Sequence, residues 1–491
     1  MSESQKKIIV VTGGAGFIGS HLCERLAQDP NNRVISLDNY FTGSHENHVE
    51  GVEYREGHTK DIAKHITEKP DLIFHLGEYA RVEQSVLEPE IVEDLNVKGT
   101  ASVIEFWQKH KCKLVYAGSS TKFGDGGDAR YTSPYAQTKA DNSERVREIG
   151  EKEKLPFAIT YFYNVYGPRE RSGVYGTVIE HFKRMYLSGA PCAIVSPGTQ
   201  TRNFTHVFDI VDGLALVGEK GEGDEFGLGN KRAYSIREVA DMFGCGESQA
   251  VMFPERIGNR MNSTLSTDKI QALGWEAQQS LTEYIKNFTS SNKRGEPLEK
   301  RVLVFSTTMY PIVGVAENSF IYLARQLPTV HFDVVTVRYG KSKDISGLPE
   351  NVHLHKVGIG SAVDKFLLPI MGGVEGVRLA HTHRYLFAWS LMASYAALAA
   401  LAVRPINRLS LLVTLADQNL DDLSVFKRGI LKMLLHRTDQ VYGTHTAQEK
   451  KVQGVTDTAL PRNTLGDGDS FANAIRFAYA DIVRHNTTLT K

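Results

Sequence analysis

The sequence has little cysteine, no excess charge and hardly any long apolar run, and each shortage excludes a class of protein. Its four cysteines, at positions 23, 112, 192 and 245, are scattered and form no Cys-x-x-Cys pair. This spacing argues against a disulfide scaffold and a zinc site, and it fits a reducing compartment. Residues 1–7 lead straight into an apolar run and leave no room for a signal peptide. We therefore expect a cytoplasmic protein.

The charges balance, with 57 Lys+Arg against 57 Asp+Glu. Such a chain has no general attraction for nucleic acid or for an anionic membrane. One uncharged stretch, 386–403, approaches the length of a membrane span, but it is mostly alanine, which contributes little to insertion. We expect a buried helix there, no stable membrane insertion and no nucleic-acid partner.

A glycine-rich turn follows the first apolar run. The β-branched stretch 8–11 breaks into Gly13, Gly16 and Gly19 and then into a helical pattern. The first glycine permits the turn, the second lets the backbone approach a pyrophosphate, and the third lets the helix pack close to the strand. Asp38 ends the next apolar run, nineteen residues past Gly19, where a ribose hydroxyl needs an acceptor. The pair predicts a dinucleotide site, and the acid favours NAD over NADP.

Strand and helix patterns alternate through the first part of the chain. Strands are expected at 33–37, 71–76 and 113–117, with a loop over 39–56. This alternation predicts an α/β fold, a Rossmann-type doubly wound parallel sheet. Gly13, Asp38, Gly77 and Ser119 all fall at carboxyl ends of strands, where such sheets bind ligands.

Tyr135 and Lys139 are four residues apart, so they share one face of the helix that follows. A tyrosine acts as a base only if its phenolate is stabilised, because its free pKa is about 10. A neighbouring ammonium and a positive nicotinamide ring would do this. Ser119 could hydrogen-bond the same substrate hydroxyl. We therefore predict that Ser119, Tyr135 and Lys139 are catalytic; the alternative is an ordinary exposed Tyr/Lys pair.

The first 288 or so residues resemble an extended short-chain dehydrogenase/reductase of the NAD-dependent epimerase/dehydratase family, and in particular its UDP-glucose 4-epimerase-like members. The ordered segments that carry the resemblance are 12–19, 61–62, 75–77, 96–100, 119–124, 135–139 and 162–168. The resemblance implies that Asp61 and Ile62 flank the adenine and that Lys139 also holds the nicotinamide ribose. It places the following residues at the NAD site: Gly13, Gly16, Phe17, Ile18, Gly19, Asp38, Asp61, Ile62, Leu76, Gly77, Asn96, Tyr135 and Lys139.

The same resemblance implies a nucleotide-sugar site, mainly in residues 166–288. Asn164 occupies the diphosphate-contacting position, and two arginines can clamp a diphosphate bidentately. The segment at Arg256 carries Asn259 in place of the usual acid. The implied substrate-binding residues are Arg81, Ser119, Ser120, Asn164, Arg202, Arg256 and Ser263. A small residue at Ser263 hints at a pocket that admits UDP-GlcNAc as well as UDP-Glc, whereas His206 is expected to be structural.

The related dehydratases and decarboxylases place an acid one or two positions after the catalytic Ser or Thr. Here those positions are Ser120 and Thr121, which argues against both reactions. The sequence therefore favours a UDP-sugar 4-epimerase with tightly held NAD, no metal and a homodimeric first domain. The alternatives are a 4-keto reductase or dehydrogenase that releases its cofactor, and a non-catalytic assembly module.

A polar stretch at 289–299 reads as a linker between domain 1–288, with its NAD-binding core at about 1–165, and a second α/β domain at 300–491. In the second domain, strands are expected at 301–305 and 332–337, a helix at 317–327 and apolar runs at 374–380 and 409–415. This domain resembles, more faintly, the N-terminal lobe of GT-B glycosyltransferases, through 310–318, 381–384 and 414–417. Too few residues follow Pro461 for a second lobe, so we expect acceptor binding or a glycosyltransferase partner rather than a complete transferase.

Two other segments of the second domain invite functional interpretations. Residues 463–471 resemble the phosphate loop of ribokinase-type kinases, with Asp469 at the base position, but nothing else in the chain matches such a kinase. We expect a loop that leads into a helix at 472–485. The basic amphipathic segment 426–437 could touch a membrane surface, but a packed helix with a solvated basic edge is the preferred interpretation.

Overall fold

The computed structural model describes residues 6–120, 122–123, 131, 133–162, 164–171, 176–253, 266–310, 312–338, 347–406, 409–415 and 425–443. The chain divides into two compact units. The first comprises Met1–Glu180, Gly198–Met242 and Arg256–Ser291, and the second comprises His181–Pro197, Phe243–Glu255 and Asn292–Lys491. Some predictions lie outside the described residues. They concern Arg256 and Ser263 in 254–265, part of the glycosyltransferase-like segment 414–417, and the kinase-like segment in 444–491.

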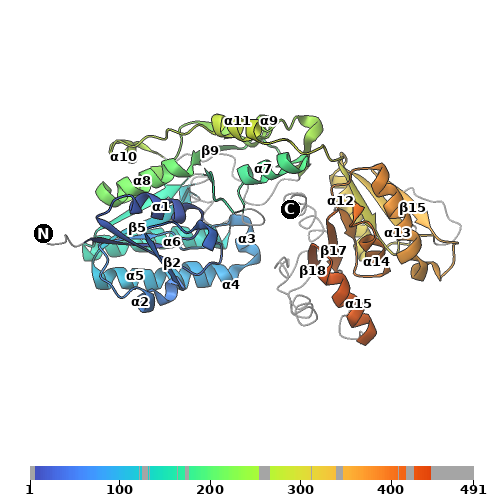
Figure 1. The fold of residues 1–491 in the computed structure, drawn as a ribbon, viewed down its shortest axis with the longest axis horizontal. Helices are drawn as coiled ribbons and strands as arrows, with labels where there is room; N and C mark the ends of the chain where they lie inside the picture. The colour runs from blue at the N-terminus through green and yellow to red at the C-terminus, as the bar shows by residue number, and fades with distance from the viewer. Residues whose placement is uncertain are drawn as a thin grey trace. The chain divides into compact units, whose positions relative to one another are not determined.

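The first unit is built on a seven-stranded parallel sheet in the order β10-β6-β5-β4-β1-β2-β3. Counted along the chain, this is the doubly wound order 3-2-1-4-5-6 with one further strand, so a crevice is expected where β1 and β4 diverge. The Rossmann-type prediction is confirmed. The strands are β1 (Lys7–Thr12), β2 (Asn32–Asp38), β3 (Val52–Glu56), β4 (Leu72–His75), β5 (Lys113–Ser119), β6 (Phe157–Phe162) and β10 (Gly223–Leu228). Figure 1 labels β2 and β5 of this sheet and several of the helices beside it.

Alternate residues of the strands feed two cores, one on each face of the sheet. From β1, Ile9 and Val11 point into a core with α1 and α8, whereas Val10 points into a core with α5 and α6. Both faces are covered, as a parallel sheet requires. The helices of this unit are α1 (Phe17–Ala27), α2 (Ile62–His65), α3 (Val82–Leu87), α4 (Pro89–Val92), α5 (Gly99–His110), α6 (Pro134–Glu153), α8 (Val207–Lys220), α9 (Ile236–Met242), α10 (Asp268–Gln271) and α11 (Leu281–Ser291).

A small three-stranded sheet, β11-β9-β7, completes the first unit. It consists of β7 (Asn164–Tyr166), β9 (Thr201–His206) and β11 (Ala233–Ser235). His206 is buried, and its Nδ1 accepts the backbone N–H of Phe208 at 3.3 Å, which caps α8. The expectation of a structural histidine is therefore confirmed. Helix α7 (Val178–Ser188) begins in the first unit and ends in the second.

The second unit contains a six-stranded parallel sheet in the order β15-β14-β13-β16-β17-β18, again the doubly wound order. This confirms a second α/β domain. Its elements are β13 (Arg301–Phe305), α12 (Val315–Gln326), β14 (His331–Val337), β15 (Val352–Val357), α13 (Asp364–Thr382), β16 (Ala388–Ser390), α14 (Tyr395–Leu401), β17 (Leu411–Leu415), α15 (Val425–His436) and β18 (Gln440–Gly443), together with the short pair β8 (Cys192–Val195) and β12 (Ala250–Phe253).

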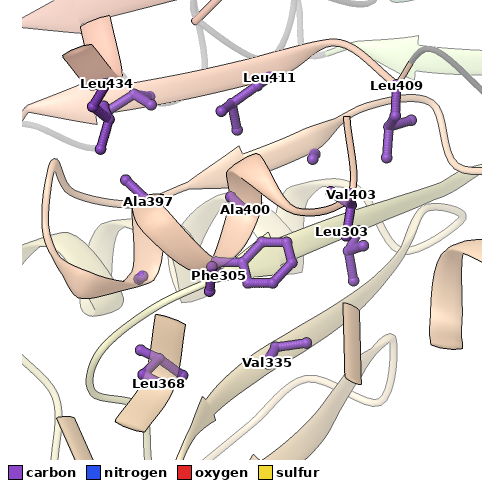
Figure 2. Packing of buried hydrophobic residues seen from close by; sticks show 14 of the residues in the cluster. Leu303, Phe305, Val335, Leu368, Ala397, Ala400, Val403, Leu409, Leu411 and Leu434 are labelled. Carbon is purple, nitrogen blue, oxygen red and sulfur yellow. The ribbon is translucent and has the colours of Figure 1, made fainter. Parts of the chain in front are cut away.

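Figure 2 shows the core of this second sheet, in which Phe305 and Val335 face Leu368 of α13 and the alanines of α14. Small residues let α13 and α14 approach closely. A Cβ at Gly372 would meet the Cβ of Ala399 at 3.4 Å, and one at Gly376 would lie 2.6 Å from the ring of Phe305. The alanine-rich composition therefore serves helix packing.

Three expectations about this architecture need correction. Stretch 386–403 is not one buried helix: it forms β16, a loop and the short helix α14, because Trp389 and its neighbours complete the sheet. The loop expected at 39–56 ends in strand β3, which pairs with β2. Cys192 and Cys245 form a disulfide although 53 residues separate them, because the fold brings them together.

Among the described residues, no helix is long and apolar enough to cross a bilayer, and no cluster of metal ligands occurs.

Candidate active site

The glycine turn between β1 and α1 has the close packing that its sequence predicts. Gly13 has φ +73°, in the left-handed region, and its carbonyl accepts the N–H of Gly16 at 3.1 Å. A Cβ on Gly19 would overlap that same carbonyl, so the helix can approach the turn only without a side chain. Gly77, which follows β4, packs against Gly13: a Cβ built on Gly13 would lie 2.9 Å from the Cα of Gly77. The start of α1 thus presents free backbone N–H groups beside an open cradle, which suits a pyrophosphate.

Asp38 ends β2 beside this turn, buried and fixed by two backbone donors. The N–H of Ala15 donates to one carboxylate oxygen at 2.9 Å, and the N–H of Tyr40 donates to the other at 2.8 Å. Burial raises the pKa of Asp38, although these hydrogen bonds oppose the rise. Each oxygen keeps a lone pair for a ribose hydroxyl. The position therefore fits the adenine ribose of NAD.

A cleft opens at the carboxyl ends of β1, β2 and β4, within the first unit. Eleven predicted residues line it: Gly13, Gly16, Phe17, Ile18, Gly19, Asp38, Leu76, Gly77, Arg81, Tyr135 and Lys139. Thr59 and Gly57 also line it, one strand beyond Asp38. The predicted residues among the described ones that do not line it are Asp61, Ile62, Asn96, Ser119, Ser120, Asn164 and Arg202.

The first three of these non-lining residues have clear local roles. Ile62 is buried in the core, and Asp61 pairs with Lys64 at 2.8 Å on the surface. Asn96 is fully buried; its Oδ1 accepts the N–H of Tyr79 at 2.6 Å, and its amide donates to the carbonyl of Tyr79 at 3.2 Å. Asn96 therefore holds the segment after β4 that forms one wall of the cleft.

The remaining residues lie on strands β5, β7 and β9 or, for Ser120, directly after β5. Ser119 and Ser120, at the end of β5, are buried, with exposed fractions of 7% each. Asn164 is on β7, and Arg202 on β9 donates to the carbonyl of Thr201 at 2.7 Å. The structure does not bring Asn164 and Arg202 into the cleft lining. Their substrate role stays a prediction.

Two of the three predicted catalytic residues, Tyr135 and Lys139, line the cleft, and Ser119 contacts Tyr135. Helix α6 begins at Pro134, where Ser133 caps it by accepting the N–H of Ala136 at 3.1 Å. This start places Tyr135 on the first turn, and its hydroxyl donates to Ser119 Oγ at 3.1 Å. Lys139, one turn later, is buried and donates to the carbonyl of Ala117 at 2.6 Å. A phenol, a hydroxyl and an ammonium are thus grouped beside the dinucleotide cradle, an arrangement that can move a proton to or from a sugar hydroxyl.

Sequence reasoning missed Glu78, which forms a hydrogen-bonded ion pair with Lys139 Nζ. Its side chain is only 1% exposed. Burial would raise the pKa of Glu78, but Lys139, His75 and the hydrogen bond from Thr100 together leave the pKa lowered. The sequence offers only a positional hint: Glu78 directly follows the segment 75–77, just past the buried strand β4.

His75, the last residue of β4, connects the cradle to this ion pair. Its Nδ1 contacts Thr12 Oγ1 at 2.7 Å, and its Nε2 contacts Thr100 Oγ1 at 2.9 Å. Complete burial lowers the pKa of His75 to about 4. The imidazole therefore stays neutral near pH 7 and acts as a hydrogen-bonding spacer.

We expect this buried histidine to make the protein acid-sensitive. The unfolded histidine takes up a proton near pH 6.5, whereas the folded one does so only near pH 4. The unfolded state binds more protons between these values, so stability falls as the pH drops through them, by roughly 2 kcal/mol from pH 7 to pH 5. Urea unfolding of the native protein and of His75→Gln at both pH values tests this. The variant should show the smaller loss, and equal losses would contradict the assignment.

The chain is similar over its N-terminal half to enzymes that act on nucleotide sugars. A UDP-N-acetyl-alpha-D-glucosaminuronate decarboxylase from Bacillus cytotoxicus is 30% identical over 262 residues, covering 48% of this chain and 78% of the relative. The structure of a Thermotoga maritima UDP-glucose 4-epimerase with UDP-glucose matches with a TM-score of 0.53 and 27% identity, covering 57% of this chain and 96% of that one.

The structure of the Thermus thermophilus UDP-glucose 4-epimerase in complex with NAD matches with a TM-score of 0.51 and 28% identity, covering 57% and 96% of the two chains. The profile of the NAD-dependent epimerase/dehydratase family matches residues 9–229. These matches agree with the glycine cradle and with Asp38, whose chemistry fits NAD, so NAD is the cofactor. Through its first half, this chain belongs to the NAD-dependent epimerase/dehydratase family.

Proposed function

We propose that the first unit is a 4-epimerase of UDP-hexoses or UDP-N-acetylhexosamines. The observation that carries the proposal is the hydrogen bond between Tyr135 and Ser119, one helical turn from the buried ammonium of Lys139. The hydroxyl at C4 of the sugar is the group this arrangement would deprotonate. The similarity to two UDP-glucose 4-epimerase structures supports the substrate class.

In this mechanism Tyr135 takes the proton of the C4 hydroxyl while Ser119 orients that hydroxyl. Lys139 stabilises the phenolate form of Tyr135, since an opposite charge nearby favours an ionised group. NAD supplies the hydride acceptor and donor when it is bound. The 4-keto sugar turns about its diphosphate between the two half-reactions, and Tyr135 then returns the proton to the C4 oxygen as the other epimer forms.

Decarboxylation and dehydration are the competing reactions within the family. The relatives include a UDP-sugar decarboxylase, so the competition is real. In the resembling decarboxylases and dehydratases an acid follows the catalytic Ser or Thr, whereas here Ser120 follows Ser119 and Thr121 comes next. Dehydration and decarboxylation need a further acid that these two positions do not supply. The chain therefore favours simple oxidation and re-reduction of the sugar at C4.

A panel of UDP-sugars tests the proposal. The full-length protein is incubated separately with UDP-glucose, UDP-GlcNAc and UDP-glucuronate, and proton NMR identifies the products. We expect UDP-glucose to reach an equilibrium with UDP-galactose, and UDP-GlcNAc with UDP-GalNAc, with no net NADH. A pentose product and CO₂ from UDP-glucuronate would establish a decarboxylase instead, and no turnover of UDP-GlcNAc would remove the N-acetyl part of the proposal.

For the second unit we propose acceptor or partner binding, following its sequence resemblance to a glycosyltransferase lobe. The switch point of its sheet lies between β13 and β16, where Thr307 Oγ1 and Ser394 Oγ are 2.9 Å apart. His383 and Arg384 do not support this role, because both precede β16 at the opposite edge and pair with Glu299 and Glu296, respectively.

We also propose that the epimerase unit forms a homodimer, which light scattering on the full chain checks.

A further inference from the structure

The buried carboxylate of Glu78 accepts four hydrogen bonds. Its Oε1 accepts from Thr100 Oγ1 at 2.8 Å, Tyr116 Oη at 3.0 Å and Asn142 Nδ2 at 2.9 Å, while its Oε2 accepts from Lys139. These donors come from α5, β5 and α6. Its side chain is 1% exposed and its pKa is lowered, so Glu78 is a buried and weak base. Its chemistry must act through Lys139.

Lys139 is held from two sides. An ammonium has three N–H donors, and in the described part of the chain the contacts of Nζ are to Glu78 and to the carbonyl of Ala117 at 2.6 Å. The ammonium also lies over the ring of Tyr116, 5.1 Å from its centroid. One donor is left for a ligand in the cleft that Lys139 lines.

Among the described residues, the groups that pack around this pair carry no other charge near neutral pH. His75 from β4 is neutral because burial lowers its pKa to about 4. Burial raises the pKa of Tyr116 from β5 well above its usual value. Thr100, Asn142 and Ser119 are uncharged, and Tyr135 is the phenol that the reaction uses. Glu78 and Lys139 thus form a buried ion pair that is surrounded by uncharged hydrogen-bonding groups.

We propose that Glu78 is a positioning residue that keeps Lys139 protonated and directs its remaining donor to the nicotinamide ribose. The inference deepens the proposed function and rests on Lys139 serving it. A buried ammonium without a counter-charge gives up its proton more easily, because burial disfavours the charged form. In Glu78→Gln, which keeps the shape of the side chain, Lys139 should therefore become neutral at a lower pH than in the native protein.

Calorimetric titration with NAD between pH 6 and pH 9 tests this proposal. The native protein should bind NAD with a nearly constant affinity over this range. Glu78→Gln should bind within about threefold of it at pH 6 and about tenfold more weakly at pH 9, as the charge-assisted hydrogen bond is lost. A flat profile for Glu78→Gln would overturn the proposal.

Three variants show that the effect passes through Lys139. Lys139→Met should bind NAD weakly at every pH. The Glu78→Gln/Lys139→Met double variant should bind NAD no more weakly than Lys139→Met alone. A further loss of affinity beyond about threefold would mean that Glu78 acts on its own. In the Glu78→Gln/Lys139→Arg double variant the profile should be flat again, because a guanidinium keeps its proton throughout. A tenfold decline in that double variant would contradict a protonation effect.

Glu53→Gln is the matched control. It makes the same chemical change in a surface ion pair with Arg33, 2.7 Å away on the neighbouring strand, and should leave NAD binding unchanged. If Glu78→Gln does not fold, Glu78→Asp is used instead. The aspartate carboxylate is one methylene further from Lys139, so the affinity of this variant for NAD should fall about threefold from pH 7 to pH 9. A flat profile would overturn the proposal. Because the readout is NAD binding, a protein that binds NAD as described but converts no UDP-sugar would refute the epimerase and leave the role of Glu78 standing.

Discussion

Replacing Tyr135 with phenylalanine is expected to lower kcat for UDP-sugar interconversion by about 10³-fold, within the usual range for loss of a general base. The phenylalanine ring fills the same space at the start of α6, so the change removes only the hydroxyl that donates to Ser119. The hydroxyl of Ser119 cannot replace it as the base, because an aliphatic hydroxyl is far less acidic than a phenol. The measurement is the initial rate of UDP-galactose formation from UDP-glucose.

NAD binding and thermal unfolding should be unchanged in this variant, which separates a chemical defect from a structural one. Tyr131→Phe is the control, since Tyr131 lies just before α6 and its side chain is 70% exposed. The control should retain the native rate. A Tyr135→Phe enzyme with more than about a tenth of the native rate would show that another group is the base.

Gly19→Ala is expected to weaken NAD binding by about 10- to 100-fold, the loss that corresponds to overpacking a tight site. The added Cβ would overlap the carbonyl oxygen of Gly13 and lie 2.8 Å from its carbonyl carbon. Both are backbone atoms of the turn, so relief requires α1 to move away from the cradle and takes its N–H groups with it. Calorimetric titration with NAD measures the change.

Gly429→Ala serves as the control for this substitution. Gly429 lies in α15, and no atom of the described residues lies within 4 Å of a Cβ built there, so the alanine should be tolerated. NAD binding should stay at the native level in that protein. An unchanged affinity in Gly19→Ala as well would mean that the glycine turn does not hold the pyrophosphate.

The parts of the site that local sequence encodes could be predicted. Gly13, Gly16 and Gly19 are fixed by the turn they must make, and the i, i+4 spacing of Tyr135 and Lys139 places both on one face of α6. Asp38 follows from its distance along the chain. Each of these predictions depends on one turn, one helix or one strand end, and each residue lines the cleft.

The parts that depend on several distant elements could not be predicted. Glu78 matters because Thr100, Asn142 and Lys139 converge on it from two helices, and no local pattern reports that convergence. The disulfide between Cys192 and Cys245 likewise joins segments far apart in the sequence. In the second unit, an uncharged run of residues does not distinguish a buried helix from a central strand followed by a helix, which is why the stretch 386–403 was misassigned.

The central claim, that the C4 hydrogen leaves the sugar and returns to it without exchange with solvent, is tested most directly with UDP-glucose deuterated at C4. The full-length protein is incubated with it in ordinary water, and the UDP-galactose formed is analysed by mass spectrometry. The account predicts that the product keeps its deuterium, with no NADH released. Loss of the deuterium to solvent, or release of one NADH for each sugar converted, would contradict it.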